Sequence, residues 1–223
     1  MVPPRDHDCD VEMRIWNADG SSATMCGNGA RCIAVWMQRE GYVNATCRIL
    51  AGGRVVTARE IKHQDQSGSA TVEMGCPELL TSREGQLIDL VDSTTITVHS
   101  VQIGNPHAVV FTEDLSDRMI SNVGPQIEHH ADFPQRTNVE LVDVRGPNEL
   151  RMRVWERGSG ETRACGSGAC AAVAAATHTG RIRKNQLCQV GLPGGTLEVH
   201  WRADGELLLS GPVEIAFSGT LIE

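Results

Sequence analysis

The sequence predicts an α+β fold of two pseudo-symmetric domains, and three observations support this prediction. The motif Cys-Gly-x-Gly-Ala occurs twice, at residues 26–30 and 165–169. Each copy opens a helix-like run, and most of the remaining chain consists of short runs with strand-like character. Two helices among many strands favour two domains, each a curved, mostly antiparallel sheet wrapped on a central helix.

The first copy of the repeat should begin with a strand at residues 11–16, which follow the proline-rich residues 2–4. The helix beside Cys26 should end at Gly41, because glycine adopts the left-handed conformation of a helix C-cap at little cost. The glycine pair at residues 52–53 then predicts a turn followed by a strand. Gly75 and Pro77 interrupt the next strand-like run, so we place a domain boundary near residues 74–77.

The second copy repeats this order. Its helix starts beside Cys165 and should end at Gly180, at the same spacing of fifteen positions as in the first copy. Residues 192–197 match residues 50–55, which predicts the same turn and strand. Further strands are expected at residues 94–98, 108–111, 139–142, 150–155 and 207–209. The N-terminal domain is predicted to comprise residues 1–73 and 213–223, and the C-terminal domain residues 74–212.

The first copy is shorter than the second at its N-terminal end. A glycine turn at residues 103–107 lies about sixty residues before Cys165, but only 25 residues precede Cys26. We therefore expect the first domain to be incomplete and to lack its first strands. A misassigned start codon, a fragment of a longer chain and a decayed gene are three explanations for this difference.

The composition argues against several classes of partner. The chain has 20 Lys and Arg against 28 Asp and Glu, a formal net charge of -8, and no basic run, so nucleic acid is not an expected partner. No apolar stretch approaches the roughly 18 to 20 residues that span a membrane, and the first residues do not form a signal peptide. We expect a cytoplasmic protein without a membrane partner.

The eight cysteines are best explained as free thiols, some of them catalytic. A cytoplasmic chain of this length does not need disulfides. No Cys-x-x-Cys pair occurs, and neither close cysteine pair has histidines at a regular offset, so structural zinc and other metals are not expected. Cys32 and Cys170 fall inside the predicted helices and should be packed.

Both motif cysteines should lie beside a helix N-terminus. The free N–H groups and the dipole of a helix end favour a thiolate, and they also bind an anion such as a carboxylate. The glycines allow the backbone to approach a ligand closely. A single Cys beside Gly is usually only a packed residue, but two matched copies in a duplicated unit favour a reactive role.

Two such thiols on either side of one α-carbon would suit the inversion of an amino acid. One thiolate removes the α-hydrogen from one face, and the other thiol donates a proton to the opposite face. We expect this active site in the cleft between the two domains. The chemistry needs no pyridoxal lysine, and the chain has only Lys62 and Lys184, neither of them in a glycine-rich loop. We therefore expect no cofactor.

With these motifs in place, the sequence resembles the diaminopimelate epimerase family from Val11 to its C-terminus. The resemblance is carried by the two cysteine loops, by the segments that lead into them at residues 17–21 and 156–162, and by Gly104-Asn105-Pro106-His107 and Asn138. Proline racemases and hydroxyproline epimerases have a similar cysteine pair, but typically a histidine where this chain has Asn28. The family also has an N-terminal Gly-Asn-Asp-Phe strand and a glutamine that are missing here.

The resemblance implies that a homodimer interconverts LL- and meso-diaminopimelate in lysine biosynthesis, without a cofactor. It assigns the acid and base roles to Cys26 and Cys165. The reacting carboxylate would be held by backbone N–H groups of the two cysteine loops, and the distal amino and carboxylate groups of the substrate by side chains. These expected binding residues are Gly27, Asn28, Gly166 and Ser167 for the reacting carboxylate, and Asn17, Asn105, Asn138, Glu156 and Arg157 for the distal end.

Other interpretations of these residues remain open. Asn17 and Asn105 could be ordinary turn residues. Glu156 and Arg157 could form a solvated ion pair that contributes little, and His107 could be structural. For the whole chain, the alternatives are a proline-racemase-like amino-acid epimerase and a catalytically impaired fragment with exposed sheet edges.

Overall fold

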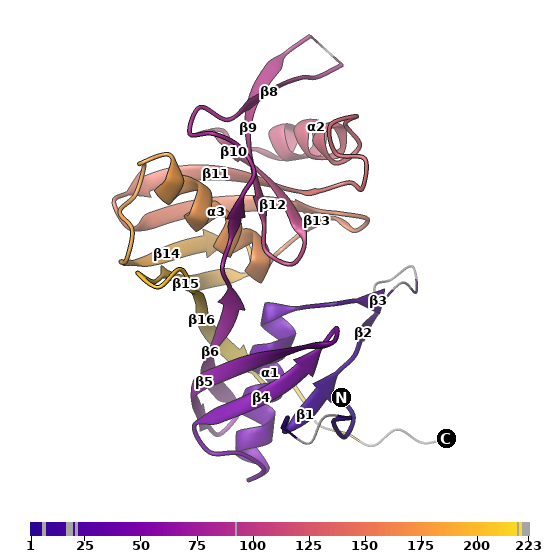
Figure 1. The fold of residues 1–223 in the computed structure, drawn as a ribbon, viewed down its shortest axis with the longest axis vertical. Helices are drawn as coiled ribbons and strands as arrows, with labels where there is room; N and C mark the ends of the chain where they lie inside the picture. Colours follow the sequence, from indigo (N-terminus) through magenta and orange to yellow (C-terminus); the bar gives the residue numbers. More distant parts are fainter. Residues whose placement is uncertain (6–7, 17–19, 21, 92, 218, 220–223) are drawn as a thin grey trace. The chain divides into compact units, whose positions relative to one another are not determined.

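The structure is a computed structural model that describes residues 1–5, 8–16, 20, 22–91, 93–217 and 219 (Figure 1). The chain divides into two compact units. Unit 1 comprises residues 1–73 and 210–223, and unit 2 comprises residues 74–209. Strands β6 (Ser67–Gly75) and β16 (Leu207–Glu214) contain the two points at which the chain passes from one unit to the other.

Unit 1 is a small sheet with one helix. In the sheet, β1 (Val11–Met13) pairs in parallel with β4 (Thr46–Ala51), and β4, β5 (Arg54–Gln64) and β6 follow one another antiparallel. Helix α1 (Gly27–Arg39) packs on β4 and β5. Two short strands, β2 (Ile15–Trp16) and β3 (Ser22–Ala23), form a separate pair. The predicted strand at residues 11–16 is therefore two strands that are interrupted at Arg14.

Unit 2 has a larger sheet in the order β15-β14-β12-β11-β10-β9-β7, with β13 added to β12 and β8 to β9. Two of its pairings, β10 with β11 and β12 with β14, are parallel, and the others are antiparallel. The strands are β7 (Glu78–Leu79), β8 (Gln86–Asp89), β9 (Thr95–Gln102), β10 (Pro106–Phe111), β11 (Asn138–Gly146), β12 (Glu149–Glu156), β13 (Gly160–Thr162), β14 (Leu187–Leu192) and β15 (Gly195–Trp201).

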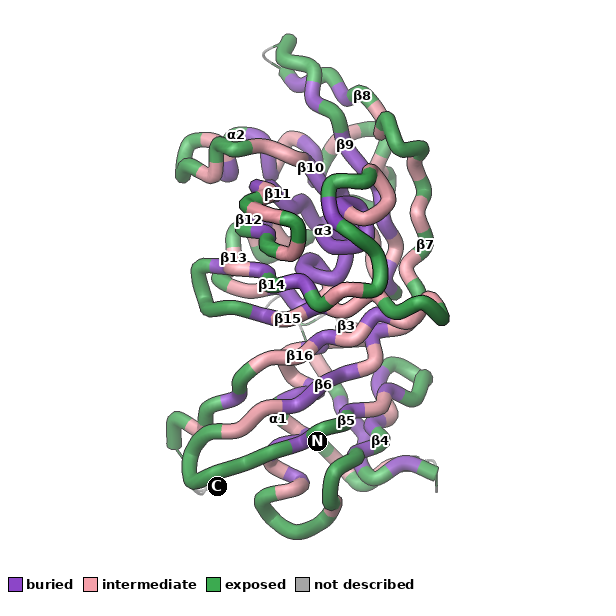
Figure 2. Tube along the Cα trace, turned by 90° about the vertical axis from the view of Figure 1, so that its left-hand side faces the viewer, coloured by how far each residue is buried: buried purple, intermediate pink, exposed green. Residues whose placement is uncertain are grey.

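Helix α3 (Gly166–His178) lies at the centre of unit 2, against β9, β10, β11, β12 and β15. Its middle is an alanine-rich run that is buried on every side (Figure 2). Small side chains allow the sheet to approach the helix from several directions, which is why this helix has no polar face. By contrast, α1 exposes Cys32 and Arg39.

A third helix, α2 (Asp117–Glu128), packs on β11, β12 and β13 (Figure 1). The sequence predicted only two helices, so this element is a correction. The helix was not predicted because it contains Gly124 and Pro125, and both residue types are unusual inside helices. Gly124 is explained by packing, since a Cβ there would lie 2.7 Å from the Trp155 ring. Ile120, Val123 and Ile127 of α2 belong to the main apolar core of the unit.

The repeat unit has the predicted form in both halves. Helices α1 and α3 each have 13 residues, and Gly41 and Gly180 follow them with the same φ of +78°. The predicted glycine turns lie between β4 and β5 and between β14 and β15. The α+β class and the five further predicted strands are confirmed as well.

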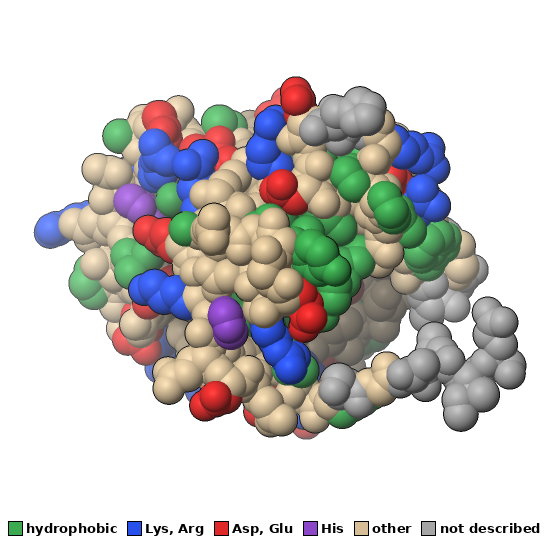
Figure 3. All heavy atoms as spheres, turned by 90° about the horizontal axis from the view of Figure 1, so that it is seen from below, with side chains coloured by type: hydrophobic (Ala, Val, Ile, Leu, Met, Phe, Trp, Pro, Cys, Tyr) green, Lys and Arg blue, Asp and Glu red, His purple; other side chains and the backbone are tan. Residues whose placement is uncertain are grey.

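The surface shown in Figure 3 carries Lys and Arg side chains interspersed with Asp and Glu, with no large patch of one sign on that face. Within the described residues, no helix is both long enough and apolar enough to cross a membrane.

Candidate active site

In unit 1 the motif cysteine is the N-cap of α1. Cys26 has extended backbone angles (φ −144°, ψ 105°), and its Sγ accepts a hydrogen bond from the Gly29 N–H at 3.3 Å. Gly27 and Asn28 form the start of the helix, and the Asn28 Oδ1 is buried without a hydrogen-bond partner among the described residues. The sulfur therefore lies at the positive end of α1, where N–H groups point outward.

In unit 2 the equivalent cysteine is the N-cap of α3. Cys165 has similar backbone angles (φ −129°, ψ 114°), but it is only 6% exposed. Its Sγ lies 3.5 Å from the Ser167 Oγ. Gly166 and Ser167 form the first turn of the helix, as Gly27 and Asn28 do in α1.

A glycine of the following hairpin holds each cysteine loop in the same way. A Cβ on Gly52 would lie 2.6 Å from the carbonyl oxygen of Thr24, two residues before Cys26. In unit 2 a Cβ on Gly194 would lie 2.9 Å from the carbonyl oxygen of Arg163, two residues before the second cysteine. Only glycine permits such close approaches, so the glycine turns that are repeated in the sequence support the cysteine loops directly.

A series of hydrogen bonds leads from the α3 loop into the sheet of unit 2. The Asn105 Nδ2 donates to the Ser167 Oγ at 3.4 Å, and the Asn105 Oδ1 lies 2.9 Å from Nε2 of His107. Nδ1 of His107 in turn lies 2.7 Å from Oε1 of Glu140. His107 and Glu140 are both completely or almost completely buried. The turn before β10 is thus joined to both α3 and β11.

Asn138 connects two loops through its side-chain amide. Its Nδ2 donates to the carbonyl oxygen of Pro106 at 2.8 Å, and its Oδ1 accepts from the backbone N–H of Arg157 at 3.0 Å. Arg157 itself is exposed, with Nη1 at 3.3 Å from the carbonyl oxygen of Gln135. Asn138 therefore uses one donor and one acceptor on the backbone, which leaves one of each for a ligand.

Two carboxylates shape the turn between β12 and β13. Glu128, at the end of α2, accepts hydrogen bonds from the Trp155 indole N–H at 2.7 Å and from the Gly158 N–H at 2.8 Å. Glu156, at the end of β12, accepts a short hydrogen bond from the Thr162 hydroxyl. Both residues fix the segment that carries Arg157.

The environment of Cys165 corrects one expectation from the sequence. A helix N-terminus was expected to favour the thiolate in both loops. In the structure, burial first, and then the nearby carboxylates of Glu156 and Glu140, raise the pKa of the Cys165 thiol well above its usual value, against the hydrogen bond from Ser167. Desolvation and like charge both disfavour the thiolate. Both effects favour the protonated form of the Cys165 thiol.

The predicted site residues fall into two groups, one in each unit. Cys26, Gly27 and Asn28 lie together at the start of α1. In unit 2 the start of α3 brings together Asn105, Cys165, Gly166 and Ser167. Glu156 lies near enough to affect the thiol electrostatically. Asn138 and Arg157 are joined to each other by a hydrogen bond. Asn17 lies outside the described residues. Cys170 is packed as predicted, but Cys32 is exposed on α1, so that prediction was wrong.

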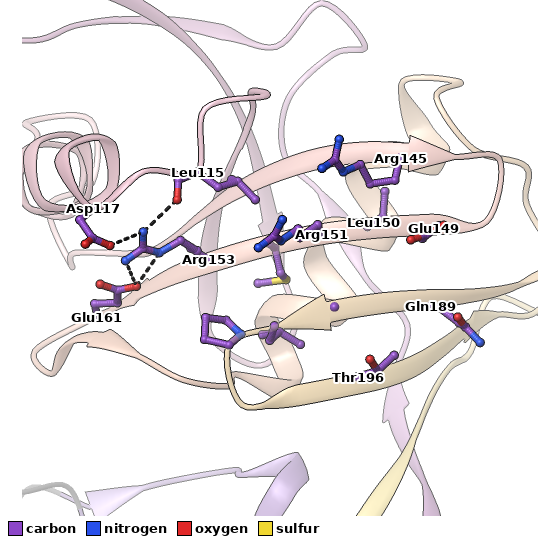
Figure 4. Close-up of a pocket in the computed structure, with 14 residues that line it drawn as sticks. Leu115, Asp117, Arg145, Glu149, Leu150, Arg151, Arg153, Glu161, Gln189 and Thr196 are labelled. Carbon is purple, nitrogen blue, oxygen red and sulfur yellow. Dashed lines mark hydrogen bonds and ion pairs between the residues drawn. The ribbon is translucent and has the colours of Figure 1, made fainter.

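A separate groove of about 640 Å³ lies on the sheet of unit 2 (Figure 4). Its central cation, Arg153, forms ion pairs with Asp117 at 2.8 Å and Glu161 at 2.6 Å. Arg151 also lines the groove and lies on the same side of β12, whereas Met152 between them is buried. Neither motif cysteine is among the described residues that line this groove.

Comparison with known proteins decides between the families that share paired cysteine loops. The sequence profile described as "Diaminopimelate epimerase" matches residues 2–80 and 99–216. This chain belongs to the diaminopimelate epimerase family. A protein named diaminopimelate epimerase from Synechococcus elongatus is 40% identical to this chain, and the match covers 98% of this chain and 80% of the relative. A protein of the same name from Desulfitobacterium hafniense is 41% identical, and the match covers 100% of this chain and 81% of the relative.

Solved structures with the same fold extend beyond the diaminopimelate epimerase family. They include a probable proline racemase from Agrobacterium radiobacter, with a TM-score of 0.76 and 15% identity over 100% of this chain and 75% of that one. A hydroxyproline epimerase from Agrobacterium vitis has a TM-score of 0.75 and 16% identity, and the match covers 96% of this chain and 72% of that one. These similarities confirm the fold class.

Sequence reasoning missed two buried carboxylates of unit 2. Glu140 stands in the run Val-Glu-Leu-Val at residues 139–142, which resembles a half-buried strand with the glutamate in solvent. Glu128 resembles an ordinary surface residue near the end of a helix. Only the pairing of β11 between β10 and β12, and the packing of α2, bury them. No local signal identifies either residue.

Proposed function

We propose that this chain interconverts LL- and meso-2,6-diaminopimelate by proton transfer at one α-carbon, without a cofactor. The observation that carries the proposal is that, in a member of this family, the cysteine of each repeated motif is the N-cap of the equivalent helix in its unit. Relatives about 40% identical over nearly the whole chain are named for this activity. The structures named as proline racemase and hydroxyproline epimerase are only 15–16% identical.

The proposed reaction breaks the Cα–H bond and makes it again on the opposite face. One cysteine, as thiolate, takes the α-proton, and the electron pair is delocalised into the carboxylate. The other cysteine, as thiol, gives its proton to the opposite face of the α-carbon, which inverts the centre and leaves the protonation states of the two sulfurs exchanged. The mechanism therefore requires one thiolate and one thiol at the same time.

The environments of the two sulfurs support an assignment of these roles. Burial and two neighbouring carboxylates raise the pKa of Cys165, so this residue starts as the thiol that donates the proton. Cys26 is only half-buried and accepts a backbone N–H from the first turn of its helix. We therefore assign Cys26 as the base in the direction of the reaction for which Cys165 is initially the protonated thiol.

The substrate carboxylate at the reacting centre would be bound by N–H groups at the starts of α1 and α3, at Gly27, Asn28, Gly166 and Ser167. Charge that develops on this carboxylate would be stabilised by preorganised N–H dipoles.

At the distal end, the exposed guanidinium of Arg157 fits the second carboxylate, and Glu156 an ammonium group. Asn17, Asn105 and Asn138 would complete the recognition of this end.

Substitution of each cysteine tests the proposal. Deuterium incorporation at the α-carbon and formation of meso-diaminopimelate should be measured in D₂O for Cys26→Ala, Cys165→Ala and the control Cys32→Ala. We expect each of the first two variants to lose about 10²–10⁴-fold in activity, because neither sulfur serves both faces. The control lies on α1 but is exposed, and it should remain active. Activity above about a tenth of wild type in either of the first two variants would contradict the assignment.

The substrate class is tested by comparison of LL-diaminopimelate with trans-4-hydroxyproline under the same conditions. Exchange with hydroxyproline alone would favour the proline-racemase-like alternative. A homodimer and a cytoplasmic location are part of the same proposal and rest on family membership. Light scattering during size-exclusion chromatography tests the dimer.

A further inference from the structure

An ionisable residue is completely enclosed in the central strand of unit 2. Glu140 is 0% exposed and lies in β11, between the apolar residues Val139 and Leu141. Its Oε1 meets His107 at 2.7 Å, and its Oε2 is buried without a hydrogen-bond partner among the described residues. Burial of a carboxyl group is unfavourable unless it is paired, and His107 is the partner that Glu140 has here.

The geometry of the pair fixes where its hydrogens are. With the Asn105 Nδ2 donating to Ser167, the Oδ1 of Asn105 can only accept, so Nε2 of His107 must carry a hydrogen. The 2.7 Å contact between Nδ1 and the Glu140 Oε1 requires a second hydrogen between these two atoms. The pair therefore holds two hydrogens, either as imidazolium with carboxylate or as imidazole with carboxylic acid.

The positions of these hydrogens determine which group is the donor in each hydrogen bond from His107 to Ser167. The Nε2–H of His107 donates to Asn105, and the amide of Asn105 donates to the Ser167 oxygen. Because that oxygen already accepts, its own hydrogen is free to point to the sulfur of Cys165, 3.5 Å away. The orientation of His107, Asn105 and Ser167, of which Ser167 lies beside the thiol, thus depends on the buried carboxyl group.

The carboxyl group also contacts the first turn of α3 directly. A Cβ on Gly168 would lie 2.7 Å from the Glu140 Oε1 and 3.3 Å from its Cγ. In unit 1 the equivalent residue, Gly29, has the Sδ of Met13 as its neighbour, at 3.5 Å from the same hypothetical atom. The two cysteine loops are alike in backbone, but one has a carboxyl group where the other has a thioether.

We propose that Glu140 is a positioning residue for the α3 cysteine: it holds His107, and through His107 the amide of Asn105 and the hydroxyl of Ser167, beside the Cys165 sulfur. The role in epimerisation rests on the proposed function. Where the pair is imidazolium with carboxylate, the Glu140 carboxylate also acts to raise the pKa of the Cys165 thiol, and the positive charge of His107 partly offsets this effect.

The other charged groups near this thiol are few in unit 2. Glu156, at the end of β12, acts in the same direction as Glu140. His107 of β10 faces Glu140 rather than the sulfur. His99 of β9 has its pKa lowered by burial and by Arg181 and His178, which places it by the other end of α3.

The first test measures the pH dependence of Cys165 alkylation by iodoacetamide, with mass spectrometry of the Cys165 and Cys26 peptides from one sample. Glu140→Gln keeps the shape, and its amide can donate to Nδ1 of a neutral His107. We expect the labelling midpoint of Cys165 to fall, with faster labelling at pH 8, because a carboxyl group that opposes thiolate formation has been removed. The midpoint for Cys26 should not change.

Asp143→Asn is the matched control, because Asp143 is a buried carboxylate three positions further along β11, on the opposite face of the sheet. It should leave the Cys165 midpoint unchanged. An unchanged midpoint in Glu140→Gln, or an equal shift in the control, would overturn the proposal. These alkylation measurements need no substrate. A lack of epimerisation with diaminopimelate would therefore refute the proposed function but would leave the test of Glu140 unaffected.

Two further measurements separate positioning from charge and from folding. Glu140→Met copies the lining of unit 1, and it should lower kcat for epimerisation more than Glu140→Gln, since His107 loses its partner. Equal kcat values would contradict the positioning role. In the wild-type protein, ¹⁵N NMR should find Nε2 of His107 protonated from pH 6 to pH 9, with the resonance assigned by its absence from His107→Gln. A ring with its only hydrogen on Nδ1 would refute the hydrogen-bonded series even if no Glu140 variant folds.

Discussion

The two helix glycines that follow the cysteines make a matched pair for mutation to alanine. Gly29 and Gly168 occupy the same position, three residues after Cys26 and Cys165. At Gly29 the new Cβ would lie 3.5 Å from its nearest neighbours, which is an ordinary van der Waals contact. At Gly168 it would lie 2.7 Å from the Glu140 Oε1, so the carboxyl group must move by several tenths of an ångström.

The expected stabilities follow from two opposing effects. Alanine is favoured over glycine within a helix by about 0.5–1 kcal/mol, and this gain applies to both variants. Overpacking a buried site typically costs about 1–3 kcal/mol, and this cost applies only to Gly168→Ala. Gly29→Ala should therefore be as stable as wild type or slightly more stable. Gly168→Ala should be about 1–3 kcal/mol less stable than Gly29→Ala.

Urea unfolding followed by near-UV and far-UV circular dichroism is the appropriate assay, because two compact units need not unfold together. Alkylation of Cys165 at pH 8 should be measured in the same samples, since a displaced Glu140 also changes the environment of the sulfur. Equal unfolding midpoints and equal alkylation rates in the two variants would refute the close contact between Glu140 and α3.

Three other predictions concern groups away from the thiols of the site. Burial raises the pKa of the Cys47 thiol to about 12, so the contribution of this group to stability should be fully present below pH 9 and fall by at most ~4 kcal/mol as pH rises to 12. Urea midpoints should therefore fall less steeply with pH in Cys47→Ala than in wild type, and the buried thiols of Cys188 and Cys165 account for the remaining slope. Ser116→Ala removes the N-cap of α2 and should lower the free energy of unfolding by about 1 kcal/mol in urea. Glu128→Ala leaves the N–H groups of Trp155 and Gly158 unpaired, so the free energy of unfolding in urea should fall by about 2–3 kcal/mol. In steady-state assays the same variant should raise KM for diaminopimelate more than it lowers kcat.

The elements that the sequence predicts well are those with local causes. The helix ends at Gly41 and Gly180 require a left-handed backbone, and glycine provides it wherever the rest of the chain lies. The motif cysteines are N-caps because the glycine-rich turn and the helix follow them directly. Helix α2 could not be predicted in this way. Its Gly124 is needed only because Trp155, some thirty residues further along, packs on that side of the helix.

The site shows the same division between local and distant causes. Asn105 and Ser167 could be selected from their motifs, but their contact through Nδ2 depends on the position of β10 against α3. Glu140 could not be selected, because a glutamate inside an alternating strand normally points to solvent. It is buried here because β11 is an inner strand with α3 packed on it. Charged residues of inner strands therefore merit attention once the strand order is known.

The duplication also explains why the two cysteines need different surroundings. A reaction with one thiolate and one thiol must break the symmetry between two loops that have the same backbone. In the proposed mechanism, the buried carboxyl group of Glu140 beside one loop, with Met13 beside the other, favours the starting state in which Cys165 is the thiol. The reverse direction then starts from the exchanged state, which the proposed reaction itself produces.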